Sequence, residues 1–277
     1  MLVTGGSSGL GLAIAERLAA DGATVTICAR TESRLQEALA RLETVAAPGS
    51  TCRSVVADVT DEARVAATVA AAVEPTGRLD AAVACAGGAG FLGPVTQLDA
   101  AAWKATLDEH LTGTMLTLKH AARELVRAGG GSFVGVSSSA VSGTTRWAAP
   151  YSVAKAGVEK LCRIAADELG ASNVRVNCIR PGMIRTGFNE EISPERLADV
   201  HDNTALERDG EVDDVASLVR FLVGGESSWI TGQVIDVDGG RCLRRGPDLR
   251  SLVEPVYGAD ALRGVVSDSQ VGHERAH

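Results

Sequence analysis

Aromatic side chains are scarce in this sequence: phenylalanine, tryptophan and tyrosine together make up 3% of its 277 residues. Small aliphatic residues and glycine must therefore fill most of the core, which favours close contacts between helices and a sheet. The sequence also lacks a run of about 18 apolar residues, the length that a membrane-spanning helix requires. Glycines from Gly5 to Gly11 interrupt its first apolar stretch. We therefore expect no signal peptide, no membrane partner and a soluble, cytoplasmic protein.

The sequence has fewer basic than acidic residues, and it lacks the closely spaced cysteine pairs that are typical of metal sites. The formal net charge is -8, which argues against nucleic acid as a partner, because phosphate binding needs a basic face. The six cysteines form no CxxC pair and have no histidine-rich neighbour. We interpret them as free core thiols in a reducing cytosol rather than as zinc ligands or disulfides, and we expect no metal site.

Short apolar segments alternate with helix-length segments from the first residue to about residue 237. Strands are expected at residues 2–4, 24–28, 53–57, 81–84, 132–136, 175–179 and 234–237. Helices are expected at residues 10–20, 34–45, 62–73, 101–128, 153–169 and 212–222. Most of the strands are nearly continuous apolar runs, which is typical of strands buried on both faces. The alternation predicts an α/β fold with a doubly wound parallel sheet in a single domain.

The regular pattern ends near residue 240. We therefore expect one domain over residues 1–240 and a C-terminal tail over residues 241–277. The tail is polar with few apolar clusters, so its default interpretation is partial disorder. Its middle, residues 252–257, has enough apolar surface to dock on a neighbouring subunit.

A glycine-rich segment, Thr4-Gly5-Gly6-Ser7-Ser8-Gly9-Leu10-Gly11, lies between the first expected strand and the first expected helix. Gly5 permits a tight turn, Gly9 lets the backbone approach a pyrophosphate, and Gly11 allows the helix to pack closely on the sheet. The start of the helix then offers N–H groups and a positive dipole end to phosphates. Glycine-rich turns are common, but this strand–loop–helix setting predicts that a dinucleotide cofactor binds here.

Tyr151 and Lys155 lie four residues apart in a segment expected to be helical, and so share one face of that helix. A nearby ammonium favours phenolate over phenol, which suits a tyrosine to general acid–base work. Lysine is rare here, with four residues against 23 arginines, although such a pair alone also fits an ordinary surface. The strand ending at Val136 leads into three serines, residues 137–139, where doubly wound sheets place their ligands. One of these serines is a candidate hydrogen-bond donor to a substrate carbonyl oxygen. The alternative is that all three are ordinary polar residues of a surface loop.

Taken together, these residues resemble the short-chain dehydrogenase/reductase family, over about residues 1–240. The resemblance implies a Rossmann-like fold and a nicotinamide cofactor bound by the TGxxxGxG segment. The family's serine lies thirteen positions before its YxxxK tyrosine, which selects Ser138 as a catalytic residue beside Tyr151 and Lys155. Asp58 matches the residue that contacts the adenine ring, and residues 181–186 match the PGxIxT segment that holds the carboxamide. The cofactor contacts implied in this way are Gly5, Ser7, Ser8, Gly9, Leu10, Asp58, Val59, Ala86, Gly87, Tyr151, Lys155, Pro181, Gly182, Ile184 and Thr186.

Two motifs depart from the family pattern. The family's NNAG loop reads Ala84-Cys85-Ala86-Gly87 here, so other groups must make the hydrogen bonds of the two missing amide side chains. The family's active-site Asn is replaced by His110, followed by Leu-Thr-Gly. A histidine that titrates near neutral pH can hold the water that this Asn holds. A histidine that only packs in the core is the other interpretation.

Cofactor preference depends on the end of the second strand. Family members that prefer NAD carry an Asp there, whereas this sequence has Ala29 followed by Arg30. An arginine can pair with a 2′-phosphate and stack on adenine. We therefore expect Arg30 to contact the cofactor, with NADP(H) preferred and NAD(H) possible. An arginine with no role at the surface is the alternative.

The resemblance implies an oxidoreductase that interconverts a secondary alcohol and a ketone, with Tyr151 as general acid/base. The substrate stays open between a small secondary alcohol, a 3-oxoacyl thioester and a hydroxysteroid-like ketone. Residues 186–210 are expected to form a lid with Phe188 and Ile192 as its apolar contacts. Trp147 is a further candidate for the pocket wall, and Arg146 or Arg185 for an acidic group of the substrate.

A rival from another class is a cofactor-binding sensor or scaffold without turnover, which the altered loop and His110 permit. The intact Ser138, Tyr151 and Lys155 oppose it. The family's two long helices pair across a two-fold axis, so a homotetramer, or failing that a homodimer, is expected.

Overall fold

A computed structural model describes residues 1–186, 193–244 and 249–265. Seven strands form one sheet in the order β3-β2-β1-β4-β5-β6-β7, and every neighbouring pair is parallel. The strands are β1 (Leu2–Thr4), β2 (Val25–Ala29), β3 (Cys52–Val56), β4 (Ala81–Ala84), β5 (Gly131–Val136), β6 (Val174–Pro181) and β7 (Val234–Val237). The predicted α/β fold is therefore confirmed, with strand ends shifted by one or two residues.

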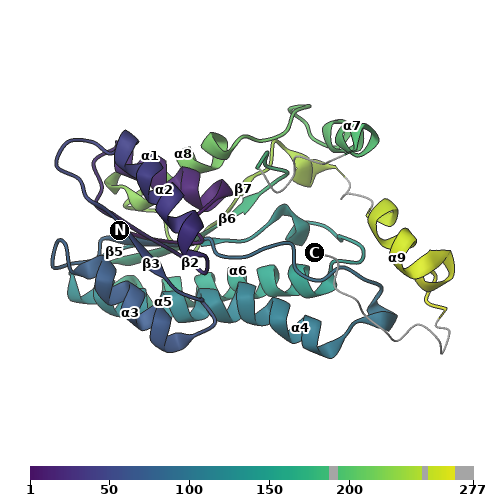
Figure 1. The fold of residues 1–277 in the computed structure, drawn as a ribbon, viewed down its shortest axis with the longest axis horizontal. Coiled ribbons are helices and arrows are strands. Elements are labelled where there is room, and N and C mark those ends of the chain that lie inside the picture. The colour runs from purple at the N-terminus through teal and green to yellow at the C-terminus, as the bar shows by residue number, and fades with distance from the viewer. Residues whose placement is uncertain (187–192, 245–248, 266–277) are drawn as a thin grey trace.

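Helices cover both faces of the sheet (Figure 1). One face carries α1 (Gly9–Ala20), α2 (Glu32–Val45) and α8 (Val212–Val223), and the other carries α3 (Glu62–Val73), α5 (Gly113–Arg127) and α6 (Ala149–Leu169). Each face has its own apolar core, because both sides of the central strands are buried. In the part of the chain that the structure describes, no helix is both long and apolar enough to cross a membrane.

Side chains define where several helices begin. The Asp61 carboxylate accepts a hydrogen bond from the Arg64 amide at 3.1 Å and starts α3. Asp99 does the same for α4 (Ala100–Leu107) through the Ala102 amide at 2.8 Å. Such caps satisfy amide groups that have no partner within the helix.

The binding crevice lies where the chain reverses its direction of winding. From β1 the sheet grows outward to β2 and β3, and it then continues from β4 on the other side of β1. Thr4, the last residue of β1, pairs with Cys28 on one side and Ala84 on the other. In doubly wound sheets the ligand lies beyond the carboxyl ends of the strands at this switch point.

The fourth long helix is interrupted, which the sequence did not reveal. We expected one helix over residues 101–128, whereas the structure has α4, a π-turn η2 (Asp108–Thr112) and then α5. A π-turn holds one extra residue per turn and is frequent at functional sites. Here it carries His110, whose side chain is buried.

Two segments beyond the predicted pattern are helical, α7 (Pro194–Asp202) in the expected lid and α9 (Arg250–Leu262) in the tail. We expected a tail that is partly disordered or docked on a neighbouring subunit, whereas α9 packs on its own chain, against Phe91 and Trp147. A contact with a second copy stays a prediction. Phe188 and Ile192 lie outside the described residues, as does most of the tail after α9.

Candidate active site

The glycine loop makes the turn that the sequence predicts. Gly5 has a φ of 70°, and its amide donates to the Cys28 carbonyl at 2.9 Å. A Cβ at Gly11 would lie 2.3 Å from the Gly5 carbonyl oxygen, so only glycine lets α1 start this close to the loop. Gly9, with a φ of 52°, is the first residue of α1. The positive end of the α1 dipole therefore faces the space beyond the loop.

A cavity of about 710 Å³ runs from this loop to the catalytic candidates. Its wall contains all four predicted catalytic residues and every predicted cofactor contact except Ser7, which is half-buried beside it. The predicted residues in the wall are Gly5, Ser8, Gly9, Leu10, Arg30, Asp58, Val59, Ala86, Gly87, His110, Ser138, Tyr151, Lys155, Pro181, Gly182, Ile184 and Thr186. A nicotinamide dinucleotide fits this wall, because glycines line the phosphate end and titratable side chains line the other.

Thr4 holds the Ala84–Gly87 loop, in which the family's two amide side chains are missing. Its hydroxyl oxygen accepts hydrogen bonds from the amides of Cys85 at 3.2 Å and Ala86 at 3.3 Å. Burial raises the pKa of the Cys85 thiol to about 11, and nearby Lys155 only partly opposes this. Cys85 therefore stays a neutral thiol near pH 7.

Tyr151 and Lys155 lie in the first two turns of α6, which begins four residues before the predicted start. The Lys155 ammonium is buried, lies 5.7 Å from the centre of the Tyr151 ring and donates to the Val136 carbonyl at 2.8 Å. One bond leaves two of its three N–H groups for other acceptors. The Ser138 oxygen accepts a bond from the Ala140 amide at 3.2 Å, so its hydroxyl proton is available to a substrate oxygen.

Glu159, which sequence analysis missed, supports this arrangement from the next turn of α6. Its buried carboxylate accepts hydrogen bonds from Ser137 Oγ at 2.7 Å and from two nitrogens of Arg180 at 2.6 and 2.7 Å. These bonds raise the pKa of the Arg180 guanidinium above its usual range. The signal was present in the sequence, because Glu159 lies four residues after Lys155 and so on the same helix face.

His110 lies against the tyrosine, with the two rings perpendicular and their centres 5.1 Å apart. Burial, together with the smaller effect of the positive charge of Lys155, lowers the pKa of His110 to about 3. The expectation that this histidine titrates near neutral pH is therefore wrong. Neither ring nitrogen has a hydrogen-bond partner among the described residues. A buried neutral imidazole can both donate and accept a hydrogen bond.

Arg30 has a partner that the sequence did not indicate. Its guanidinium pairs with the Glu109 carboxylate of η2 at 3.2 Å, and both side chains line the cavity. Asp58 lies nearby: burial tends to raise its pKa, but hydrogen bonds from Thr60 and the charge of Arg30 outweigh this and lower it. The cavity wall therefore holds two arginines here, Arg30 and Arg34, and two carboxylates, Asp58 and Glu109.

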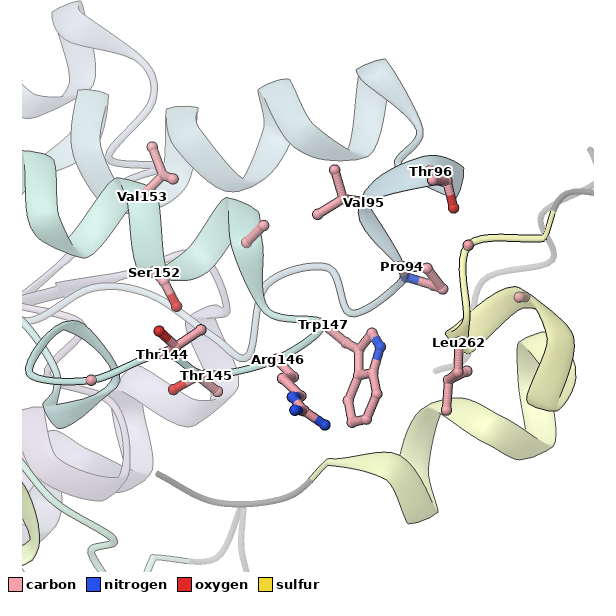
Figure 2. A pocket seen from close by; sticks show the side chains of 14 residues that line it. Pro94, Val95, Thr96, Thr144, Thr145, Arg146, Trp147, Ser152, Val153 and Leu262 are labelled. Atoms are coloured by element: carbon pink, nitrogen blue, oxygen red, sulfur yellow. The ribbon is translucent and has the colours of Figure 1, made fainter. Parts of the chain in front are cut away.

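The substrate end differs from the prediction. Trp147 and Arg146 line a neighbouring cavity of about 540 Å³ and not the one that contains Tyr151 (Figure 2). Arg185 pairs with Asp209 at 3.1 Å. Three leucines that were not predicted at the substrate end, Leu92, Leu249 and Leu252, line the active-site cavity instead.

One cluster has the composition of a metal site, formed by Asp236, Asp238 and Cys242, whose ligand atoms all lie within 4.8 Å of one another. The Asp238 carboxylate already accepts bonds from the amides of Gly240 and Cys242, at 2.9 and 2.7 Å. We assign no metal to this cluster, because these bonds account for the position of Asp238.

Comparison with known proteins identifies the fold and its chemistry. A family model described as enoyl-(acyl carrier protein) reductase matches residues 5–241. Human dehydrogenase/reductase SDR family member 4 is 35% identical over 243 residues, which is 86% of both chains. The chain belongs to the short-chain dehydrogenase/reductase family. As a member of this family it is an oxidoreductase that acts on CH–OH groups.

Two further similarities refine the family match. A short-chain dehydrogenase/reductase structure from Mycobacterium ulcerans has 51% identity and a TM-score of 0.93, and the match covers 96% of this chain and 97% of that one. The cis-4-hydroxycyclohexanecarboxylate dehydrogenase of Sinomonas cyclohexanicum is 37% identical over 239 residues, 86% of this chain and 94% of that protein.

Structures of short-chain dehydrogenases with bound cofactor are also similar to this chain. A 7α-hydroxysteroid dehydrogenase complexed with NADH has 28% identity and a TM-score of 0.81, and covers 86% of this chain and 92% of its own. An actinorhodin polyketide ketoreductase with NADPH has 30% identity and a TM-score of 0.80, and covers 87% and 96%. The family similarity therefore supports a nicotinamide cofactor.

Proposed function

We propose that this protein interconverts a secondary alcohol and a ketone, with NADP(H) as its preferred cofactor. One observation carries the proposal: Ser138, Tyr151 and Lys155 line the same cavity as the glycine loop. A substrate oxygen beside Tyr151 would thus lie in the same space as a cofactor whose phosphates meet the start of α1. The sensor alternative lacks a comparable supporting observation, since the family and the site both fit turnover.

The proton transfer is assigned to Tyr151. When bound, the nicotinamide ring supplies or accepts the hydride at the reacting carbon. Ser138 donates a hydrogen bond to the carbonyl oxygen, and the Tyr151 hydroxyl donates a proton to it. In the oxidative direction the Tyr151 phenolate removes that proton. Lys155 stabilises the phenolate by its positive charge, and its remaining N–H groups are available to the ribose of the cofactor.

His110 is proposed to hold a water molecule in the place of the family's asparagine. The ring lines the cavity, and its nitrogens have no hydrogen-bond partner among the described residues, although the Glu109 carboxylate lies 4.0 Å from Nε2. Because the pKa is lowered to about 3, the ring stays neutral at physiological pH and acts by donating and accepting hydrogen bonds. A histidine that only packs would leave two buried polar atoms unsatisfied, which costs about 1–3 kcal/mol each.

The preference for NADP(H) rests on Arg30. The second strand ends at Ala29 with no carboxylate, and Arg30 lines the cavity. A charge-assisted bond to a 2′-phosphate contributes about 1.5–3 kcal/mol. The Glu109 carboxylate opposes this, because Arg30 must leave it to meet a phosphate. An exposed pair of this kind is worth only about 0.2–1 kcal/mol, so the phosphate contact prevails.

The substrate classes differ in how well they suit the cavity. The name of the Sinomonas relative specifies a cyclohexane ring with a hydroxyl group, and the 7α-hydroxysteroid dehydrogenase acts on a fused ring system. The three leucines at the substrate end favour such a hydrocarbon ring over a polyol. A 3-oxoacyl thioester remains the second candidate, supported by the description of the matching family model.

A homotetramer, or a homodimer, is proposed as the assembly. Met115, Val126, Val153 and Ile164 are apolar residues of α5 and α6 that are exposed in the single chain. Pairing of these two helices with a second copy would bury them. Light scattering at micromolar concentration tests this, and a monomer mass would contradict it. The cytoplasmic location expected from the sequence stays a prediction.

Turnover of a ketone panel by three variants tests the proposed chemistry. Tyr151→Phe should keep cofactor binding but lose turnover by about 10²–10⁴-fold, the usual contribution of general acid–base catalysis. Lys155→Met should lose turnover and also weaken cofactor binding, because the Lys155 ammonium is assigned to the cofactor ribose as well. Lys160→Met is the matched control, because Lys160 is exposed on the same helix and lies outside the cavity wall. Turnover of Tyr151→Phe within a few-fold of the parent would show that another group transfers the proton.

A further inference from the structure

The C-terminal helix α9 lies outside the part of the chain that the family model matches, which ends at residue 241. Figure 1 shows it at the same end of the molecule as α7, away from the N-terminus. One face of the helix is buried, through Val253, Tyr257 and Ala261, which are spaced four residues apart. Val253 and Tyr257 share one face of the first part of α9; the backbone is non-helical at Gly258 (φ 79°, ψ 158°), and Ala261 continues the buried stripe in the second part. An apolar stripe of this kind anchors the helix to the domain.

The stripe packs on both loops that surround the catalytic tyrosine. Its apolar contacts include Phe91, in the loop after β4, and Trp147, just before α6. The Tyr257 hydroxyl donates to the Leu92 carbonyl at 3.3 Å. Gly93 makes room for it, since a Cβ there would lie 3.0 Å from the Tyr257 oxygen. The position of α9 is therefore set by the same segments that shape the site.

Trp147 links the helix to the catalytic segment. It has a φ of 65°, which is strained for a bulky residue, and its carbonyl accepts a bond from the Gly93 amide at 2.8 Å. Figure 2 shows its indole between the loop that carries Pro94 and the end of α9 at Leu262. The strained backbone is held by this packing four residues before Tyr151.

The start of this helical segment contributes to the active-site cavity. Leu249, directly before α9, and Leu252, in its first turn, line the cavity that contains Ser138 and Tyr151. Leu92, whose carbonyl receives the Tyr257 hydroxyl, lines it as well. An apolar wall from outside the matched domain thus faces the substrate end.

We infer that α9 is the specificity element of this enzyme, and that Leu252 with Leu249 and Leu92 holds an apolar alkyl or alicyclic group of the substrate. The inference rests on the proposed function, in that the ligand is an alcohol or ketone whose oxygen meets Tyr151. A polyol or a charged group at this end would lose hydrogen bonds to water without replacement. Each buried methylene of the ligand should strengthen binding about fourfold, the equivalent of about 0.8 kcal/mol.

Binding of a series of 4-alkylcyclohexanols, from unsubstituted to propyl, tests the inference. The titrations use the Tyr151→Phe protein with NADP⁺, so that binding is measured without turnover. The dissociation constant should fall about fourfold per methylene. In Tyr151→Phe/Leu252→Ser this dependence on chain length should be lost. Leu252 is 41% exposed, so serine is compatible with the fold. Val256→Ser in the same background is the matched control, because Val256 is exposed on α9 and lies outside the cavity wall.

The outcomes separate this inference from the proposed function. Two results would overturn the role of α9. One is a dissociation constant that depends on chain length in the Leu252→Ser protein as it does in the Tyr151→Phe protein. The other is a dissociation constant that does not depend on chain length in the Tyr151→Phe protein itself. Turnover of cyclohexanones by the parent would still support the proposed function in that case. Conversely, a dependence that Leu252→Ser abolishes, without turnover by the parent, would support the role of α9 and refute the proposed chemistry.

Discussion

The imidazole of His110 lies where a side chain at residue 87 would be. A Cβ placed on Gly87 would come within 2.5 Å of both Cε1 and Nδ1 of His110, and Gly87 has a φ of 153°. The glycine of the loop after β4 and the histidine of the π-turn therefore fit each other. Both line the cavity, and the histidine ring also meets the Tyr151 ring at a right angle.

Substitution of Gly87 should show this fit as a non-additive effect. Gly87→Ala should lower the free energy of unfolding by about 1–3 kcal/mol, because the methyl group overpacks against the ring. In a His110→Ala background the same substitution should lower it less, since only the backbone strain remains. Chemical denaturation of the four proteins measures the coupling. Equal effects in both backgrounds would show that the ring moves aside freely.

The low pKa of His110 predicts how stability changes with pH. In the unfolded chain the histidine takes up a proton below its ordinary pKa of 6.5, whereas in the folded protein it does so only near about 3. The unfolded state therefore binds more protons in this window, and stability falls as the pH falls through it. One proton corresponds to about 1.4 kcal/mol per pH unit.

Denaturation between pH 6 and pH 4 measures this slope. His110→Asn, which restores the family's residue, should have a slope smaller than that of the parent by about one proton. Because both proteins contain the same other titrating groups, the contributions of those groups cancel when the two slopes are subtracted. Parallel slopes for the two proteins would show that His110 is protonated as readily in the folded state as in the unfolded state.

The sequence predicted the fold because its signals are local. Apolar runs, glycines at a strand–helix turn and a Tyr–Lys spacing each act over a few residues, and the parallel sheet and the family were confirmed. The π-turn at His110 and the pairing of Arg30 with Glu109 depend on residues brought together by the fold. No pattern within a short window indicates such contacts.

The position of the tail could not be predicted for the same reason. Val253 and Tyr257 have helical spacing, but their partners Phe91 and Trp147 lie more than 100 residues earlier in the sequence. The apolar content of this segment was recognised, but its partners in the same chain were not, and the expectation stayed between partial disorder and docking on a neighbouring subunit. Low aromatic content also concealed the importance of these few rings, because most of the core is aliphatic.

Cofactor preference should change when Glu109 releases Arg30. Glu109→Gln should tighten NADPH binding by about 1.4- to fivefold, the value of an exposed ion pair, with less effect on NADH. Arg30→Ala should weaken NADPH by about 10- to 150-fold and again affect NADH less. Fluorescence titration of both reduced cofactors measures these constants. Equal dissociation constants of NADPH and NADH in the parent would show that Arg30 takes no part in the choice.

Glu159 is expected to position the catalytic segment rather than to touch the substrate. Its carboxylate joins α6 to Ser137 and to Arg180 of β6, and Ser137 precedes Ser138. Ser137 Oγ also lies 3.2 Å from the Lys155 carbonyl oxygen. Loss of the carboxylate therefore frees the strand end and the helix turn that carry the catalytic groups. It also leaves the mostly buried Arg180 with only its longer contact to Asp236, at 3.5 Å.

Glu159→Gln should thus lower both stability and kcat, with little change in the KM for the cofactor. Removal of one partner of a fully buried ion pair lowers stability by about 3–5 kcal/mol, and the loss is smaller here because Arg180 keeps Asp236; replacement of both partners is far milder. Glu159→Gln/Arg180→Met should therefore regain most of the stability but not kcat, because Ser137 still lacks its charged acceptor. Thermal unfolding and steady-state kinetics of both variants separate the two effects. If the double variant regained kcat together with stability, Glu159 would be structural only. If instead kcat stayed low while the protein unfolded at the parental temperature, the carboxylate would hold Ser137, and through it Ser138, in place for the proton transfer.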